Sequence, residues 1–448
     1  MKRTILNQLV QWKESPRRKP LLLQGPRQVG KTWALHEFAR TEFTNLAYID
    51  FLIDEDMKRV FEGSLNPKRI LDAIALQTNT DAGNPQTLVV FDEVQECPRA
   101  LTSLKTFQQE RPDVPIVAAG SLLGVALHGR DKGVSFPVGK VDHLHMTPMT
   151  FSEYLEGVGE HRMAALLEQA DETLIEAFSE RFTEELRRYY FIGGMPEAVA
   201  TYAQTNDYEL VRSVQNRLLT DYELDFSKYA TPSLSERIRL VWKSLPAQLA
   251  RENKKFIYSA VRTGGRARGY EEAIQWLVDA GLAMRINRIS KPGIPLASYE
   301  DKEAFKLYML DTGLLGAASR LDPATLVTGN RLFTEFKGAL TENYVCQELR
   351  ASGKIALTYW SAENSTGEVD FVYDWQGEII PVEVKAEVNL KAKSLRSFVE
   401  KNALRRGVRL SLAGFDRQSW ITNIPLYAAS LLPEGLSLVE PIDTAQTH

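Results

Sequence analysis

The stretch from Leu21 to Thr32 constrains the fold of this chain more than any other part of the sequence. Its apolar start, Leu21–Leu23, predicts a buried parallel strand, and Trp33–Arg40 has the periodicity of a helix. The loop between them, Gly25–Thr32, fits the pattern G-x-x-x-x-G-K-[ST]. The alternative is a chance glycine turn. Because strand, loop and helix stand in the required order, the sequence favours a phosphate-binding loop.

Each residue type in this loop has a chemical reason. Gly25 and Gly30 let backbone N–H groups close around phosphate oxygens, and the helix N-terminus adds the positive end of its dipole. Lys31 reaches the outer phosphates as a catalytic contact, and the Thr32 hydroxyl is suited to ligate Mg²⁺. We therefore expect a nucleoside triphosphate and Mg²⁺ as cofactors. The predicted nucleotide-binding residues are Gly25, Pro26, Arg27, Gln28, Val29, Gly30, Lys31, Thr32 and Trp33.

A second stretch, Leu88–Glu93, predicts the other half of this site. Four apolar residues make a buried strand, and its C-terminal end presents two carboxylates. Asp92 suits the role of holding Mg²⁺, usually through water. Glu93 suits the role of the catalytic base that orients the attacking water. The adjacent acidic pair favours hydrolysis of the nucleotide over phosphoryl transfer to a small acceptor.

The apolar run Pro115–Gly120 predicts a further buried strand, with Ser121 at its tip. The Ser121 hydroxyl could sense the γ-phosphate or the attacking water, which would make it a catalytic residue. The alternative is that Ser121 caps a helix that follows the strand, and the sequence leaves both open.

Composition excludes several classes of protein. At 448 residues the chain is too long for one ordinary hydrophobic core, and its length predicts about three domains. The net charge of −4 excludes a chain that is basic overall, so nucleic-acid binding would require a local basic patch. No apolar run is long enough to span a membrane, and Met1–Val10 lacks the apolar region of a signal peptide. We therefore expect a protein of the reduced cytoplasm with no membrane partner.

The order of predicted elements indicates an α/β chain of four regions. Residues 1–150 predict a P-loop domain with a parallel sheet, and residues 151–232 predict a helical lid or linker domain. In residues 233–330, helices precede two alternating stretches that predict a hairpin, which is the order of a winged helix. Residues 331–448 predict a second α/β domain.

The winged-helix-like region has a basic bias that the whole chain lacks. A contact with the phosphate backbone of DNA is one explanation of this local patch, and a packing module with a solvated basic face is the other. The sequence leaves both open. The basic residues are Lys254, Lys255, Arg262, Arg266, Arg268, Arg285, Arg288 and Lys291.

The last third of the chain carries a second set of candidate catalytic residues. A helix at 333–352 contains Glu342, and strands are predicted at 355–360, 368–375 and 378–386, before a helix at 393–403 and a strand at 407–413. This is the element order of a restriction-endonuclease-type core with the pattern PD-(D/E)xK.

Side chains alternate along a strand with period two, so Glu368 and Asp370 share one face of their strand, and Glu383 and Lys385 share one face of theirs. In a nuclease of this kind, Asp370 and Glu383 would hold Mg²⁺ and Lys385 would steady the attacking water or the developing charge. Glu342 could complete the carboxylate set. The alternative is a buried ion-pair network that cleaves nothing, and it stays open.

Short motifs along nearly the whole chain are similar to those of a prokaryotic family that joins an AAA-type ATPase domain to a C-terminal, nuclease-like DUF4143 domain. This resemblance implies an AAA-type parallel sheet and ATP as the nucleotide. It rests on Gly25–Thr32, Leu88–Gln95, Ala119–Ser121, Pro148–Tyr154, Gly193–Glu197, Asp311–Leu315, Glu342–Val345, Glu368–Phe371 and Pro381–Lys385.

One position departs from the family pattern. Members usually have Gly-Arg ahead of the Pro-x-x-Phe-x-Glu motif, whereas this chain has Gly139-Lys140. An ammonium group cannot make the forked contact of a guanidinium, so a γ-phosphate-sensing role for Lys140 is in doubt. Arg130 is a weak substitute.

Two hypotheses of function follow. In the first, the protein is an ATP-driven enzyme acting on DNA, in which the nucleotide state licenses cleavage by the C-terminal domain. In the second, it is a nucleotide-dependent switch or scaffold whose nuclease-like domain binds a partner. The sequence leaves open whether the chain forms an oligomer.

Overall fold

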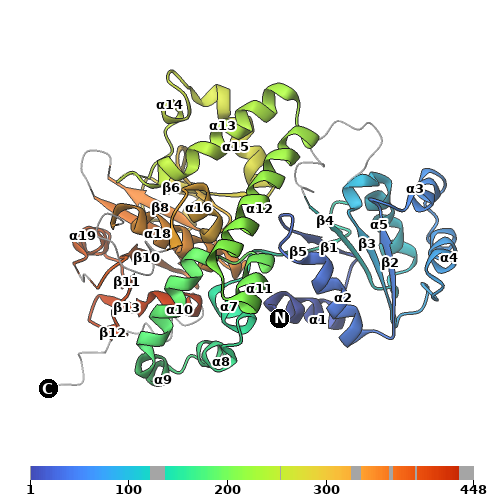
Figure 1. Cartoon of the computed structure of the whole chain (residues 1–448), viewed down its shortest axis with the longest axis horizontal. Coiled ribbons are helices and arrows are strands. Elements are labelled where there is room, and N and C mark those ends of the chain that lie inside the picture. Colours follow the sequence, from blue (N-terminus) through green and yellow to red (C-terminus); the bar gives the residue numbers. More distant parts are fainter. Residues whose placement is uncertain are drawn as a thin grey trace. The chain divides into compact units, whose positions relative to one another are not determined.

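The computed structural model describes residues 2–121, 137–252, 254–323, 334–362, 367–388 and 391–432, with side chains from 336 onward in the helix that begins at Thr334. The chain divides into two compact units (Figure 1). The first is Met1–Thr147 with Asp279–Gly281, and the second is Pro148–Val278 with Leu282–His448. In the described part of the chain, none of the helices has the length and apolar character needed to cross a membrane.

The first unit is built on a five-stranded parallel sheet in the order β2-β3-β4-β1-β5. This confirms the parallel α/β sheet predicted from the two motifs. The strands are β1 (Leu21–Gln24), β2 (Asn45–Asp50), β3 (Thr87–Asp92), β4 (Ile116–Gly120) and β5 (Asp142–His145).

Helices cover both faces of this sheet because its central strands are apolar on both sides. In Figure 1, α1 and α2 lie on one side of the sheet and α3, α4 and α5 on the other. On the second side, Phe51, Phe61 and Phe91 pack together with ring centroids 5.4–5.7 Å apart. The helices are α1 (Thr4–Glu14), α2 (Lys31–Glu42), α3 (Glu55–Glu62), α4 (Pro67–Thr78) and α5 (Pro98–Glu110), with a 3₁₀ turn η1 (Val94–Glu96).

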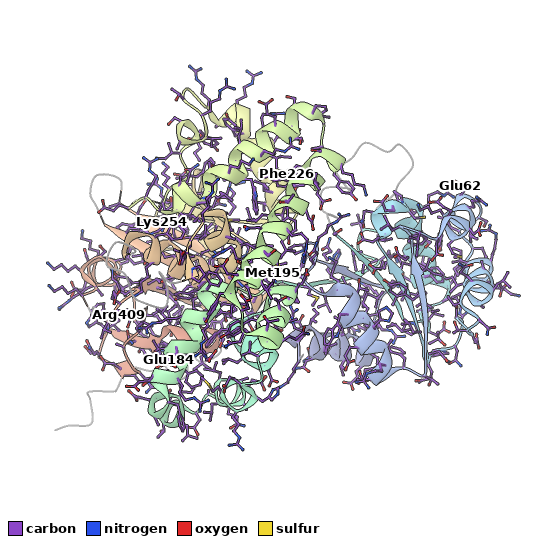
Figure 2. All side chains as sticks on the ribbon, viewed as in Figure 1. Glu62, Glu184, Met195, Phe226, Lys254 and Arg409 are labelled. Atoms are coloured by element: carbon purple, nitrogen blue, oxygen red, sulfur yellow. The ribbon has the colours of Figure 1, made fainter. Side chains whose placement is uncertain are left out.

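The second unit begins with a helical region, as predicted. Its apolar interior is rich in aromatic side chains: Phe226, labelled in Figure 2, packs edge-on against Trp242 and Trp276. The helices up to the first hairpin are α7 (Phe151–Gly157), α8 (His161–Gln169), α9 (Glu172–Ala177), α10 (Ser179–Ile192), α11 (Pro196–Thr205), α12 (Tyr208–Tyr229), α13 (Pro232–Leu249), α14 (Tyr258–Val261) and α15 (Ala267–Asp279).

The rest of the second unit is organised around an eight-stranded mixed sheet in the order β12-β13-β11-β10-β9-β8-β6-β7. The strands are β6 (Ala283–Ile289), β7 (Glu300–Met309), β8 (Thr358–Ser361), β9 (Glu368–Trp375), β10 (Glu378–Val384), β11 (Gly407–Ser411), β12 (Asp416–Arg417) and β13 (Ile421–Pro425). Helices α16 (Thr312–Ala318), α18 (Thr334–Ala351) and α19 (Lys393–Lys401) and the 3₁₀ turns η2 (Leu296–Tyr299) and η4 (Leu426–Leu431) complete this unit.

The hairpin β6–β7 lies at one end of this mixed sheet, because β6 pairs in parallel with β8. The order α13, α14, α15, β6, β7 is that expected of a winged helix, and Phe256 adds a backbone hydrogen bond from its N–H to Phe305 O. The strands of the expected wing are thus continuous with the sheet formed by residues 358–425. Sequence patterns did not predict this continuity, nor the strands β12 and β13.

Several motifs of the family resemblance meet in the interior of the second unit. The Gly194 N–H donates to Oδ1 of buried Asp311 at 2.6 Å, and the Met149 N–H donates to Gly194 O at 2.6 Å. A Cβ at Gly194 would lie 2.1 Å from Met149 O, so only glycine fits there. Gln347, on α18, donates to the Tyr189 hydroxyl and accepts the Thr312 N–H. These motifs therefore have a packing role.

Candidate functional site

The phosphate-binding loop connects β1 to α2, and its two glycines have backbone conformations that other residues avoid. The φ angle is +153° at Gly25 and +95° at Gly30, the N-cap residue of α2. A Cβ at Gly25 would lie 2.3 Å from the backbone oxygen of Met146. Both positions therefore need glycine for local geometry as well as for approach to a phosphate.

Lys31 begins α2, and its side chain folds back over the loop. Its Nζ donates hydrogen bonds to the carbonyl oxygens of Gly25 at 2.9 Å and Pro26 at 2.7 Å. Burial lowers the pKa of Lys31 to about 8, although the carboxylates of Glu93 and Asp92 act in the opposite direction. A phosphate oxygen is a stronger acceptor than a carbonyl oxygen, so this ammonium group is placed to transfer its hydrogen bonds to a bound nucleotide.

Asp92 ends β3 and is buried beside the start of α2. Its Oδ2 accepts a hydrogen bond from the Thr32 hydroxyl at 2.9 Å and another from the Tyr48 hydroxyl. The imidazole of His36 packs against the Tyr48 ring, with centroids 4.8 Å apart and the ring planes tilted by 31°. Thr32 and Asp92, the two predicted Mg²⁺ ligands of this unit, thus touch each other directly.

Glu93 follows Asp92 and belongs to a chain of hydrogen bonds. The Arg27 Nε donates to the Ser121 hydroxyl at 3.2 Å, and this hydroxyl donates to Oε2 of Glu93 at 3.3 Å. The side-chain amide of Gln95 donates to the same Oε2. Glu93 has a φ of +47°, an uncommon conformation for a non-glycine residue. The helix-cap alternative for Ser121 concerns residues 122–136, outside the described part of the chain.

Strand order explains why these side chains meet. The strand β4 lies between β1 and β3, with Gln24 opposite Gly120 and Phe91 opposite Ala118. The carboxyl ends of parallel strands lie at one edge of a sheet, where ligands bind in open α/β folds. The phosphate loop, Ser121 and the Asp92–Glu93 pair therefore share that edge.

The remaining predicted loop residues differ in their surroundings. Val29 is buried, and its carbonyl oxygen accepts a hydrogen bond from Arg3 at 2.9 Å. Trp33 lies on α2 and is 41% exposed. Sequence reasoning missed the roles of Tyr48 and Arg3, because their contacts depend on which strands and helices are neighbours. It also missed Gln95, whose contact with Glu93 is local and could have been suggested by the spacing of two residues.

The residues at this edge fit ATP and Mg²⁺. The backbone N–H groups of the loop and Lys31 suit phosphate oxygens, and the Thr32 hydroxyl and Asp92 carboxylate are the hard oxygen ligands that Mg²⁺ prefers. Lys140, at the departure from the family pattern, lies in the turn before β5, where its N–H donates to Pro137 O. Arg130 lies outside the described residues.

The C-terminal carboxylates gather around a lysine that sequence reasoning did not include. Lys306, on β7, is completely buried, and its Nζ contacts Oε1 of Glu368. It lies 3.7 Å from Oε2 of Glu342 and 3.9 Å from Oδ1 of Asp370. Burial alone would lower the pKa of Lys306, but Glu342, Glu368 and Asp370 together raise it. This ammonium group is therefore the cation of the cluster.

A second lysine completes the ion pairing at Glu342. The Nζ of Lys254, labelled in Figure 2, donates to Oε1 of Glu342 at 2.6 Å, and the Tyr308 hydroxyl donates to Oε2 at 3.1 Å. Although burial opposes it, the two lysines lower the pKa of Glu342. Glu342 thus lies with the other carboxylates, as the sequence suggested, but as the partner of two lysines.

The three residues of the predicted nuclease pattern lie close together at the end of the hairpin β9–β10. Oδ2 of Asp370 accepts the Val384 N–H at 2.8 Å, and burial raises the pKa of Asp370 to about 7. The Nζ of Lys385 lies 2.5 Å from Oε1 of Glu383. The other Glu383 oxygen, Oε2, is buried with no hydrogen-bond partner in the described residues.

No set of three or more His, Cys, Asp or Glu side chains within the described ranges is arranged to hold a metal ion. The C-terminal cluster therefore has the contacts of an ion-pair network, with one carboxylate oxygen still unsatisfied.

Three sequence families match successive parts of the chain. An AAA domain, AAA_14, matches residues 17–155. A domain of unknown function, DUF8612, matches residues 183–325. A second domain of unknown function, DUF4143, matches residues 337–428. No curated protein matches the chain.

Solved structures match at low identity. The Walker-type ATPase of Pyrococcus abyssi is 16% identical over 71% of this chain and 95% of that chain, with a TM-score of 0.43. The RuvB Holliday junction branch migration motor of Thermotoga maritima is 15% identical over 64% and 90%, with a TM-score of 0.30. The ORC1 protein of Aeropyrum pernix, in complex with DNA, is 13% identical over 71% and 90%, with a TM-score of 0.26. By its sequence matches, the chain joins a region similar to an AAA domain to one similar to DUF8612 and then to one similar to DUF4143.

Proposed function

We propose that the protein hydrolyses ATP in a Mg²⁺-dependent reaction at the edge of the first sheet. One observation carries the proposal: Lys31, Thr32 and the Asp92–Glu93 pair, which come from two distant motifs, meet at the carboxyl ends of neighbouring parallel strands. The matching AAA domain supports ATP as the nucleotide.

Each of these side chains has a role that follows from its contacts. Lys31 binds the outer phosphates in place of the Gly25 and Pro26 carbonyl oxygens. Thr32 and Asp92 hold Mg²⁺, which when bound neutralises charge on the phosphates. Glu93, fixed by Ser121 and Gln95, orients a water molecule and accepts its proton.

The test compares two variants of the site. Lys31→Ala should lose nucleotide binding, which is measured with a fluorescent ATP analogue. Glu93→Gln should keep binding but lower the rate of phosphate release by about a hundredfold or more, because it removes the group that orients the water.

Exposed residues on α5 supply the matched controls: Lys105→Ala and Glu110→Gln carry the same changes and should leave binding and turnover unchanged. Equal turnover by the wild type and Glu93→Gln would contradict the assignment of the base.

For the C-terminal cluster, the contacts favour the network of ion pairs over a nuclease centre. We propose that Lys306 supplies the positive charge that a divalent cation would supply in a nuclease. One observation favours the nuclease candidate, the unsatisfied Oε2 of Glu383 beside Asp370. Against this candidate, Mg²⁺ at Asp370 and Glu383 would have to bind close to the Lys306 ammonium group, whose positive charge would repel it.

Two measurements on the full-length protein separate the candidates. Titration calorimetry with Mn²⁺ on the Asp92→Asn variant, which lacks the proposed carboxylate ligand of the first site, should show no ion bound at the second unit. Supercoiled plasmid should stay intact with Mg²⁺ or Mn²⁺, with and without ATP. Cleavage that disappears in Asp370→Asn would instead establish the nuclease.

We also propose DNA as the macromolecular partner of the second unit. The helix and strand order of residues 232–309 is that of a winged helix, and basic side chains concentrate there in a chain of net charge −4. A filter-binding assay with a labelled DNA duplex, with and without ATP, tests this partner.

A further inference from the structure

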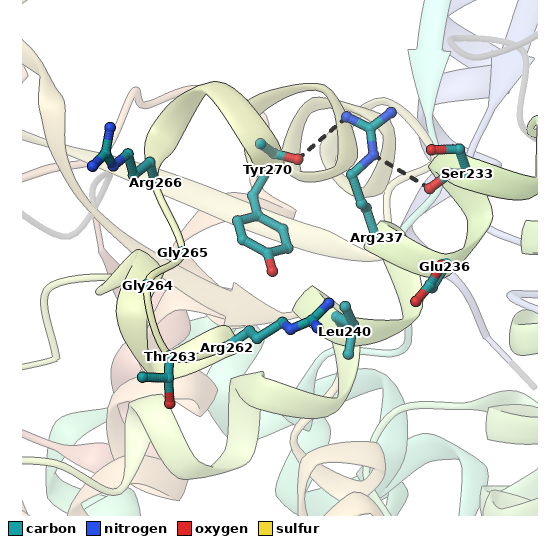
Figure 3. A pocket seen from close by; sticks show the side chains of 11 residues that line it. Ser233, Glu236, Arg237, Leu240, Arg262, Thr263, Gly264, Gly265, Arg266 and Tyr270 are labelled. Atoms are coloured by element: carbon teal, nitrogen blue, oxygen red, sulfur yellow. Dashed lines mark hydrogen bonds between the residues drawn. The ribbon is translucent and has the colours of Figure 1, made fainter.

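A cavity opens on the second unit between α13, α15 and the loop that precedes α15 (Figure 3). Its volume is about 590 Å³. The loop residues Arg262–Arg266 form one wall, and Ser233, Arg237 and Leu240 of α13 lie opposite. In Figure 3, Arg262 and the Tyr270 ring point into this space, whereas Arg266 points away from it. The cavity and its rim therefore carry arginines on more than one side.

The arginines of this loop differ from the other basic residues of the region. Three of the other basic residues have acidic partners: Lys254 pairs with Glu342, Arg285 with Glu271 and Arg288 with Asp301. Lys291 lies over the Tyr299 ring, 4.9 Å from its centroid. In contrast, Arg262, Arg266 and Arg268 are exposed and have no ion-pair partner in the part of the chain that the structure describes. The three exposed arginines thus concentrate positive charge within seven residues, around one loop.

Nearby acidic side chains do not cancel this charge. Glu272 pairs with Arg237 at 3.0 Å, and Glu271 is engaged by Arg285 and by the Tyr258 hydroxyl. Glu236, on the α13 side of the cavity, is the one carboxylate among the residues that line it. The lining includes three arginines, and Arg237 is already paired with Glu272. Arg262 and Arg266 therefore outnumber Glu236, which leaves the cavity and its rim with a net positive charge that favours an anion.

The loop backbone is tightly constrained, which fixes the points from which the arginine side chains leave the backbone. Gly264 has a φ of +79°, and a Cβ at Gly265 would lie 2.5 Å from Tyr258 O. The Gly265 N–H donates to Arg262 O at 2.8 Å, which closes the turn. The turn therefore needs its glycines and places Arg262 and Arg266 on either side of them.

The same turn connects two helices that precede a hairpin. Helix α14 is followed by the turn Arg262–Arg266 and by α15, and the strands β6 and β7 come next. In helix-turn-helix proteins, the N-terminal part of the second helix enters the major groove of DNA and residues around it contact the backbone. Arg268 lies in the first turn of α15 and Arg266 directly precedes that helix, so the helix dipole adds to the charge of both.

We infer that the Arg262–Arg268 loop and the start of α15 bind the phosphate backbone of double-stranded DNA. The inference rests on DNA being the proposed partner and names the surface that would contact it. Guanidinium groups bind phosphate with paired hydrogen bonds, and Tyr270 offers a hydroxyl to the same cavity. A duplex of B-form DNA admits a helix in its major groove, whereas the major groove of duplex RNA is too narrow.

The experiment measures binding of a fluorescent 30-base-pair DNA duplex to the full-length protein by anisotropy at several salt concentrations. The test variant is Arg262→Ala/Arg266→Ala/Arg268→Ala. It should bind at least about tenfold more weakly, and its salt dependence should fall by about one unit per lost phosphate contact. The control Lys393→Ala/Arg396→Ala/Lys401→Ala removes the same charge from exposed positions on α19 and should bind like the wild type.

The outcomes distinguish this inference from the proposed partner. If the wild type binds DNA and the test variant binds equally well, the surface is wrong and the DNA partner stands. If the wild type binds no DNA, both are wrong. Tighter binding of an RNA duplex than of the DNA duplex would also overturn the inference. A single variant, Arg268→Glu, repeats the test if the triple variant melts at a lower temperature than the wild type, and it should also weaken binding.

Discussion

The hydroxyl of Tyr48, on β2, donates a hydrogen bond to Oδ2 of Asp92 at the end of the neighbouring strand β3. The Thr32 hydroxyl donates to the same oxygen. Tyr48 is therefore a positioning residue for the predicted Mg²⁺ site, and together with Thr32 it orients the carboxylate.

Replacing Tyr48 tests this role. Tyr48→Phe should raise the Mg²⁺ concentration needed for half-maximal ATP turnover by about tenfold, because outer-shell hydrogen bonds orient metal ligands. The rate at saturating Mg²⁺ should change less. Tyr299→Phe, on the β6–β7 hairpin, is the control. An unchanged Mg²⁺ requirement would show that Asp92 needs no support from Tyr48.

Ser121 links Arg27 to Glu93, so its hydroxyl should matter for turnover more than for binding. Ser121→Ala should lower the maximal rate of ATP hydrolysis by about tenfold with little change in nucleotide affinity, as expected for a group that orients the base. Steady-state kinetics separates the two effects. Ser121→Thr keeps a hydroxyl and should restore most of the rate. A loss of affinity instead of rate would place Ser121 in nucleotide binding.

Lys306 should be essential to the stability of the second unit. Lys306→Met leaves Glu342, Glu368 and Asp370 without their central cation, and breaking a buried ion pair costs about 3–5 kcal/mol. Urea unfolding followed by tryptophan fluorescence measures this loss. Lys302→Met, at an exposed position of the same strand, should cost little. The double variant Lys306→Met/Glu368→Gln should recover part of the stability, and a failure to do so would argue against the pairing.

Glu348 should make the second unit less stable as the pH rises. Burial, assisted by Glu153 and opposed by the Phe151 N–H, raises the pKa of Glu348 to about 8. Its pKa in the unfolded chain is about 4.3. The folded state therefore holds a proton that the unfolded state has released, and this stabilisation is lost as the pH rises from about 4.5 through 8.

Thermal unfolding between pH 5 and pH 9 tests this dependence. Glu348→Gln cannot ionise, so its melting temperature should rise relative to that of the wild type as the pH increases. Glu184→Gln, at an exposed position of α10, should follow the wild type across the range. Parallel curves for the wild type and Glu348→Gln would mean that Glu348 does not release its proton in this range.

The sequence alone determined the parts of this protein that depend on local pattern. The loop Gly25–Thr32 is recognisable from sequence because a phosphate-binding loop needs three features within a few residues. These are glycines at positions with a positive φ angle, the start of a helix and a lysine. The pair Asp92–Glu93 follows a short apolar run that predicted a buried strand, and β3 confirms it. Parallel sheets bring such strand ends to one edge, so the meeting of these two motifs was predictable before any coordinates.

Tertiary structure decided the identity of the partners that complete each site. Tyr48 reaches Asp92 because β2 is the neighbour of β3, and local periodicity does not specify strand order. Lys306 meets Glu368, 62 residues further along the chain, because β6–β7 joins the same sheet as β8 and β9. An isolated pattern of Asp, Glu and Lys fits both a metal site and an ion-pair network. What distinguishes the two here is a fourth charged residue, Lys306. Only the pairing of distant strands brings it into the cluster.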